Sequence, residues 1–140
     1  MNGTIQAAQP TTVEVGAFTR GVRYGLVAVA WLFAVGVVVQ IFLAGLSLFE
    51  SSEYWANHVD IGHMISLLVY LLPILALLGR VGRQRIVLAF AVLALYLVQI
   101  ILPMIDVGFI AALHALNAFL VLGAAFDLGR SVLGLAQARD

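Results

Sequence analysis

Few side chains in this sequence could carry chemistry, and they lie in stretches that are otherwise apolar. These polar positions are Gln40, His58, Asp60, His63, Ser66, Gln99, His114 and Asn117. If the apolar stretches cross a membrane, each polar side chain there is costly and is therefore a candidate functional residue. The chain has no cysteine, which excludes disulfides, a thiolate nucleophile and cysteine-ligated zinc or iron–sulfur sites.

The three histidines are the strongest candidates for ligands. His63 and His114 each lie about two turns into what we expect to be the second and fourth helices of a bundle. Two imidazoles at matching depth on diagonal helices could ligate a haem iron from both sides in an apolar interior. His58 is a rival of His63, because the two project from different sides of one helix. Asp60, three residues before His63, could accept a hydrogen bond from its second ring nitrogen. The sequence therefore predicts a haem b site with His114 as one ligand and either His58 or His63 as the other.

Four further residues are candidate contacts of this cofactor. Gly62 lies four residues after His58 on the same helix face, where a flat ring could approach the backbone. Asn117, Gln40 and Gln99 are the polar candidates, although hydrogen bonding between helices is the simpler role for the two glutamines. The same structural role is the alternative for the histidines. Zinc or copper suits this placement less well, since such an ion needs a compact ligand set.

The elements that must position these residues follow from composition. The 140 residues are 64% hydrophobic and 10% charged, whereas a soluble domain is about half apolar and about a quarter charged. Apolar runs cover about 24–49, 61–79, 86–105 and 107–126, and each is close to the roughly 20 residues that span a bilayer. We expect helices at about 22–48, 56–79, 84–103 and 108–128. Their short connections predict an all-α fold, an integral membrane antiparallel four-helix bundle.

The charges predict which way the bundle faces. All seven basic residues are arginines, and they flank the first run, the connection between the second and third, and the end of the fourth. The other two connections carry acidic residues instead. The positive-inside rule then places both termini in the cytoplasm. We expect a mobile cytoplasmic tail at 1–19, a four-helix transmembrane domain at 20–130 and a cytoplasmic tail at 131–140. A net charge of zero gives no basic surface for nucleic acid.

The sequence also repeats itself weakly. Residues 38–43 (Val-Val-Gln-Ile-Phe-Leu) match residues 97–102 (Leu-Val-Gln-Ile-Ile-Leu). Later in each half comes a histidine with a small polar residue three positions on, which pairs His63 and Ser66 with His114 and Asn117. The repeat predicts two pseudo-symmetric helical hairpins, an arrangement that often places a site between its halves.

Two stretches resemble heme A synthase. Residues 55–62 (Trp-Ala-Asn-His-Val-Asp-Ile-Gly) are similar to its Trp-x-His-Arg segment, and residues 97–102 with Ala112-Leu113-His114 are similar to its passage from helix 3 to helix 4. That family has two four-helix bundles, each with haem-ligating histidines on its second and fourth helices. Over residues 24–128 the chain resembles one such bundle, which implies His58 and His114 as ligands. Val59 stands where the family has arginine, and the family's catalytic glutamate has no counterpart in this chain. These departures count against oxygenase activity on haem, but they do not count against haem binding.

The chain also resembles small four-helix bacterial membrane proteins of unknown function. The shared patterns are Gln-x-x-Leu-Ala-Gly-Leu at 40–46, His-x-x-x-Gly at 58–62 and Leu-His-x-x-Asn at 113–117. This resemblance implies a multi-pass protein of the bacterial plasma membrane. The sequence leaves two functions open. One is haem binding for electron transfer or haem handling near the outer face, with quinone binding at the histidines as a variant. The other is a non-catalytic small subunit or assembly factor of a larger membrane complex, and homo-oligomers are compatible with both.

Overall fold

The structure, a computed structural model, describes residues 16–138, and these fold into four long α-helices. The elements are α1 (Ala17–Phe49), α2 (Tyr54–Leu78), α3 (Arg83–Ile101), the short 3₁₀ helix η1 (Leu102–Met104) and α4 (Gly108–Gln137). Each long helix has the length and composition to cross a membrane. Helices suit this environment because they satisfy their own backbone hydrogen bonds where no water is present. The predicted all-α four-helix bundle is confirmed.

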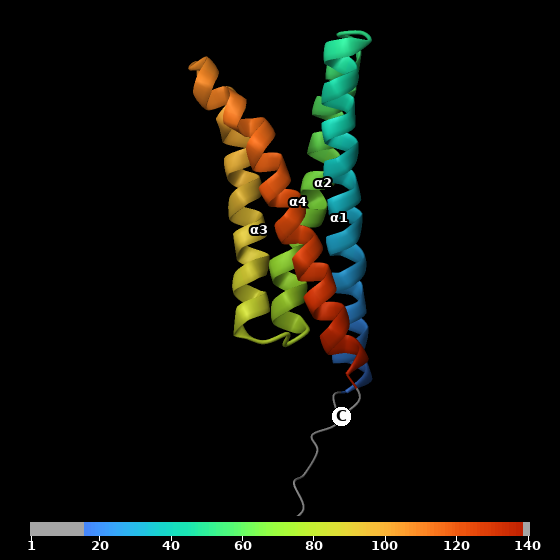
Figure 1. The fold of residues 1–140 in the computed structure, drawn as a ribbon. Coiled ribbons are helices and arrows are strands. Elements are labelled where there is room, and N and C mark those ends of the chain that lie inside the picture. The colour runs from blue at the N-terminus through green and yellow to red at the C-terminus, as the bar shows by residue number, and fades with distance from the viewer. Residues whose placement is uncertain (1–15, 139–140) are drawn as a thin grey trace, which may run out of the picture.

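Consecutive helices run antiparallel and form two hairpins, α1–α2 and α3–α4 (Figure 1). Helix α1 packs against both α2 and α4, and α3 packs against α4 and α2. Among the described residues, the backbones of α2 and α4 do not come into contact, so these two helices are diagonal as predicted. The connections 50–53 and 102–107 lie apart at the upper end of Figure 1, which we call the histidine end. The opposite end, with the turn 79–82, we call the arginine end.

The tightly packed core lies toward the arginine end. The largest fully buried side chains are Phe33, Leu26, Leu72 and Leu128, followed by five valines. On α2 the buried residues lie at 69–76, which leaves the half toward the histidine end without buried positions, and on α3 no buried residue follows Tyr96. The two hairpins therefore meet through a dense core at one end and separate at the other.

Two arginines tie the helices together at the arginine end. The Nε group of Arg23 on α1 donates to the carbonyl of Gly79, which follows α2, at 3.0 Å. The Nε group of Arg85 on α3 donates to the carbonyl of Ser131 on α4 at 3.1 Å. Gly82, in the turn between α2 and α3, has a φ of 87°. Glycine adopts this conformation without the steric cost of a Cβ. These two arginines therefore stabilise the contacts between helices, in addition to indicating the orientation of the bundle in the membrane.

The helices are longer than the apolar runs. Helix α4 was expected to end at about 128 but continues to Gln137, and α1 begins at Ala17 rather than at about 22. Residues 131–137 and 17–19, which we expected in tails, are therefore helical. Hydropathy predicts only the part of a helix that lies in the bilayer, whereas a helix can continue beyond it where side chains pack. Val132 and Ala136 are buried, so packing supports the last two turns of α4. Residues 1–15, where we expect a mobile cytoplasmic tail, and residues 139–140, the end of the second expected tail, lie outside the described part of the chain.

The outward surface is strongly apolar. Large side chains such as Phe42, Leu67 and Leu120 are exposed by 63%, 69% and 61%. A soluble monomer rarely leaves so many large apolar residues in contact with water. The helices therefore present the surface of a multi-pass membrane protein to lipid.

Candidate functional site

A partly open cavity of about 220 Å³ lies between the two hairpins, in the loosely packed half toward the histidine end. Its lining is predominantly apolar, with a few polar groups from all four helices. The lining residues are Val37, Gln40, Trp55, His58, Val59, Gly62, His63, Ile65, Tyr96, Gln99, Ile100, Pro103, His114, Ala118 and Val121. Six of the seven predicted site residues thus line one cavity, and the seventh, Asn117, is buried immediately beside it.

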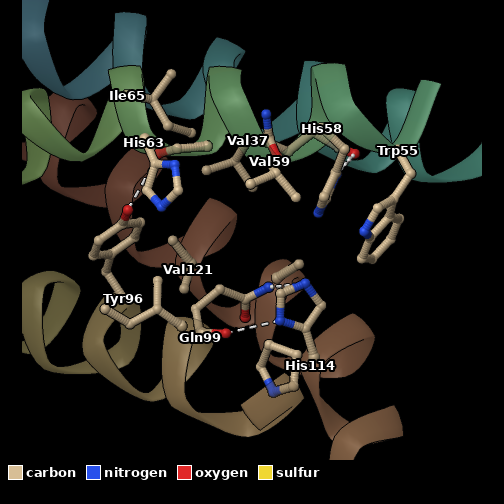
Figure 2. Close-up of a pocket in the computed structure, with 15 residues that line it drawn as sticks. Val37, Trp55, His58, Val59, His63, Ile65, Tyr96, Gln99, His114 and Val121 are labelled. Atoms are coloured by element: carbon tan, nitrogen blue, oxygen red, sulfur yellow. Dashed lines mark hydrogen bonds between the residues drawn. The ribbon is translucent and has the colours of Figure 1, made fainter. Parts of the chain in front are cut away.

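Two imidazoles approach each other across this cavity. The rings of His58 on α2 and His114 on α4 have centroids 6.2 Å apart and planes inclined by 67°. Figure 2 shows the two side chains extending from opposite walls toward each other. Because α2 and α4 are diagonal helices, the opening between the hairpins is what gives their side chains a common space.

His58 is held in place on two sides. Its Nδ1 lies 3.0 Å from the carbonyl oxygen of Gln40 on α1. A carbonyl only accepts, so Nδ1 carries the proton and donates, which leaves Nε2 with a lone pair. The ring of Trp55, one turn earlier on α2, stacks on the imidazole with centroids 5.0 Å apart and planes inclined by 19°. The ring is therefore fixed in both tautomer and orientation.

His114 is held by a longer network on α3. Its Nδ1 donates to the carbonyl of Gln99 at 2.8 Å, so Nε2 again has the lone pair. The side-chain amide nitrogen of Gln99 lies 3.2 Å from that Nε2 and donates to it. Asn117 fixes the orientation of the Gln99 amide, because its Nδ2 donates to Gln99 Oε1 at 2.7 Å and to the carbonyl of Leu95 at 2.9 Å. Asn117 is 7% exposed.

The two halves of the site correspond, but not through the histidine that the sequence repeat suggested. In each hairpin a histidine on the second helix donates from Nδ1 to the main-chain carbonyl of a glutamine on the first. The two glutamines, Gln40 and Gln99, are equivalent positions of the repeat. The equivalent of His114 is therefore His58, and the predicted pairing of His63 with His114 is wrong. The sequence alignment allowed for a longer connection in the first half and so matched His114 with His63. The shared hydrogen bond to a glutamine carbonyl instead matches His114 with His58.

His63 lies at the edge of the cavity. Its side chain is exposed, although it contributes to the lining. Asp60, the expected hydrogen-bond acceptor for His63, is also exposed, and the carbonyls of Gln40 and Gln99 are the acceptors for the other two histidines. Gly62 approaches the Gln40 side chain closely, since a Cβ there would meet Gln40 Oε1 at 3.3 Å.

Sequence reasoning missed two aromatic residues of the site. Trp55 stacks on His58, and the spacing of three residues on one helix was the available signal. The hydroxyl of Tyr96 donates to the carbonyl of Gly62 at 3.3 Å and so joins α3 to α2 at the cavity. No local pattern marks Tyr96, because its partner is 34 residues away.

Comparison with known proteins gives a similarity without an activity. Residues 40–105 match a protein family of unknown function (DUF6220). No curated protein and no solved structure matches the chain. The family match is compatible with the expected resemblance to membrane proteins of unknown function, whereas none of the comparisons confirms the resemblance to heme A synthase. The matched segment includes His58 and Gln99 but ends before His114 and Asn117.

Proposed function

We propose that this protein binds a b-type haem between His58 and His114. The observation that carries the proposal is the pair of facing imidazoles, each with Nδ1 anchored on a main-chain carbonyl and Nε2 left as the nitrogen with a lone pair. Neutral imidazoles oriented in this way by a hydrogen bond on the second nitrogen are typical ligands of a metal. Haem would supply one-electron redox chemistry at the iron.

The spacing of the two rings suits one metal ion between them. With metal–nitrogen bonds of about 2 Å, the two ligating nitrogens of a bis-imidazole centre are about 4 Å apart. Ring centres lie further out than the ligating nitrogens, which agrees with the 6.2 Å between the His58 and His114 centroids. The cavity is smaller than the roughly 300–1,000 Å³ typical of ligand sites. It is partly open, however, so a macrocycle larger than the cavity can extend into the space between the hairpins.

The small number of protein ligands favours haem over a bare ion. Within residues 16–138, no group of three or more histidine, aspartate or glutamate side chains is arranged to hold a metal. Structural and catalytic zinc sites take three or four protein ligands. Two facing imidazoles in an apolar cleft are instead sufficient for a metal that brings its own equatorial ligands.

The position of the site supports a role in electron transfer or haem handling near one membrane face. The positive-inside rule supports an orientation with both termini and the arginine end in the cytoplasm. The haem would then lie toward the outer face of the bacterial plasma membrane, where the opening between the hairpins gives access from the bilayer or from the outer surface.

The absorption spectrum of the purified protein tests this function. We expect protein extracted in detergent from haem-replete cells to show a Soret band, with split α and β bands after reduction. His58→Ala and His114→Ala should each abolish the low-spin spectrum, because each removes one axial ligand. The matched control is His63→Ala, which removes the exposed histidine and should leave the spectrum intact. A haem-free preparation from haem-replete cells would refute the proposal.

A non-catalytic subunit of a larger membrane complex is the second candidate, and the surface of α1 favours it. Gly21 and Gly25 are spaced four residues apart, and a Cβ at either would meet open space. Such small-xxx-small patterns allow another transmembrane helix to approach closely. In this role the His58 and His114 substitutions would leave association with the partner unchanged.

A further inference from the structure

We infer that Gln99 is a positioning residue that masks the ligating nitrogen of His114 until the cofactor displaces it, so that His58 binds the iron first. This inference rests on the proposed haem-binding function. The two halves of the site differ in the glutamine side chain, which donates a hydrogen bond to the histidine in the second hairpin and, within the described residues, not in the first.

The mask is built from a chain of directed hydrogen bonds in the second hairpin. Asn117 donates to both the Leu95 carbonyl and Gln99 Oε1, which fixes the Gln99 amide with its nitrogen toward His114. That nitrogen donates to Nε2 of His114 at 3.2 Å, while Nδ1 of the same ring donates to the Gln99 carbonyl at 2.8 Å. One residue thus engages both nitrogens of His114, and the lone pair that would bind iron is already an acceptor.

The first hairpin lacks this mask. The position equivalent to Asn117, three residues after the histidine, is Ile61, which has no polar group to fix a glutamine amide. Within the described chain, Nε2 of Gln40 is buried without a hydrogen-bond partner. The one hydrogen bond of His58 there is made by Nδ1, so its Nε2 is free. The asymmetry therefore follows from the residue at this position, which is asparagine in one repeat and isoleucine in the other.

An order of ligation follows from this asymmetry. Nε2 of His58 would be available to iron with no hydrogen bond broken, whereas Nε2 of His114 would become available only after Gln99 withdraws its amide nitrogen. That nitrogen would then be left without a partner in an apolar cavity, which is costly. Gln99 therefore competes with iron for His114 throughout the life of the complex. A permanently competing donor suits a haem that is taken up and released, so the inference favours haem handling over fixed electron transfer.

Chemical modification of the haem-free protein tests the mask directly. Diethyl pyrocarbonate acylates the imidazole nitrogen that has the lone pair, and mass spectrometry measures each site separately. We expect His58 to react several times faster than His114 in the wild type. Gln99→Met, which keeps the length of the side chain and removes the amide, should raise the rate at His114 to about that of His58. Gln40→Met is the matched control in the other repeat and should leave the His114 rate unchanged.

Haemin binding followed in a stopped-flow spectrometer tests the consequence. In the wild type we expect a high-spin species with one axial ligand, followed by slower conversion to the low-spin species with two. Gln99→Met should shorten or remove the delay. Asn117→Leu, which releases the Gln99 amide without altering Gln99, should act in the same direction and guards against a folding defect in one variant.

The two experiments separate the inference from the function beneath it. Equal acylation rates at His58 and His114 in the wild type, or a Gln99→Met variant with unchanged His114 reactivity and unchanged conversion, would overturn the mask. Absence of haem binding in every variant, together with the expected acylation pattern, would instead overturn the proposed function while the hydrogen-bond mask itself stands.

Discussion

Tyr96 is the residue that closes the cavity on the side of the core. It is 6% exposed, its ring meets Phe33 edge to face at 5.9 Å, and its hydroxyl donates to the Gly62 carbonyl. Because Phe33 and Gly62 belong to the first hairpin and Tyr96 to the second, this side chain joins the two. We predict that Tyr96→Phe lowers the free energy of unfolding by about 0.5–1.5 kcal/mol, since only the hydrogen bond is lost. Unfolding in mixed micelles of increasing SDS content, followed by circular dichroism, measures the change.

The control for this prediction is another tyrosine of the bundle. Tyr70 on α2 is 44% exposed, and its hydroxyl makes no hydrogen bond within residues 16–138. Tyr70→Phe should therefore leave the unfolding midpoint where it is in the wild type. If the two substitutions shift the midpoint equally, the hydroxyl of Tyr96 does not join the hairpins.

At the scale of helices, the close approach of α1 and α4 depends on Gly129. A Cβ at this position would overlap the indole of Trp31 on α1. We predict that Gly129→Ala destabilises the bundle by about 1–3 kcal/mol, the usual cost of inserting an extra carbon into a packed interface. The same SDS titration measures the loss, and Trp31→Ala in the same protein should recover part of it because the overlapping ring is removed.

Gly134 on the same helix supplies the matched control. A Cβ there would meet nothing within 4 Å. Gly134→Ala should be neutral or stabilise the protein by up to about 1 kcal/mol, because alanine costs less backbone entropy in a helix than glycine does. Loss of stability in both alanine variants would mean that helix propensity, rather than contact with Trp31, decides the outcome.

The helices were predictable from the sequence because a membrane-spanning helix needs apolar side chains along its whole length. Four apolar runs of sufficient length, separated by charged or proline-containing connections, allow little besides four spans. The end of α4 was not predictable in this way, since Asp127 and Arg130 interrupt the apolar run without ending the helix. The two side chains form an exposed ion pair at 3.2 Å, one turn apart, and α4 continues beyond them.

For the whole molecule, the sequence indicated the residues of the site but not their partners. The expected cluster came together because polar residues in apolar helices avoid lipid and gather at the interior. Spacing along one helix could not show which histidine of α2 lies near His114, because the rotation of α2 relative to α4 brings the ring of His58 to 6.2 Å from that of His114. The network from Leu95 to His114 joins separate helices, so no local pattern could reveal it.

The orientation of the bundle gives the last prediction, and the absence of native cysteine makes it clean to test. Arginines crowd the turn 79–82 and its flanks, while the connection 50–53 carries acidic residues and no basic one. We predict that Ser52→Cys is labelled in intact cells by a membrane-impermeant maleimide, and that Gln84→Cys is labelled only after the cells are permeabilised. The positive-inside rule gives this direction, because arginine-rich connections stay on the cytoplasmic side. The cysteine-free wild type sets the background. Labelling of Gln84→Cys but not Ser52→Cys in intact cells would invert the bundle and move the cavity, with His58 and His114, to the cytoplasmic face, where a haem would meet different partners.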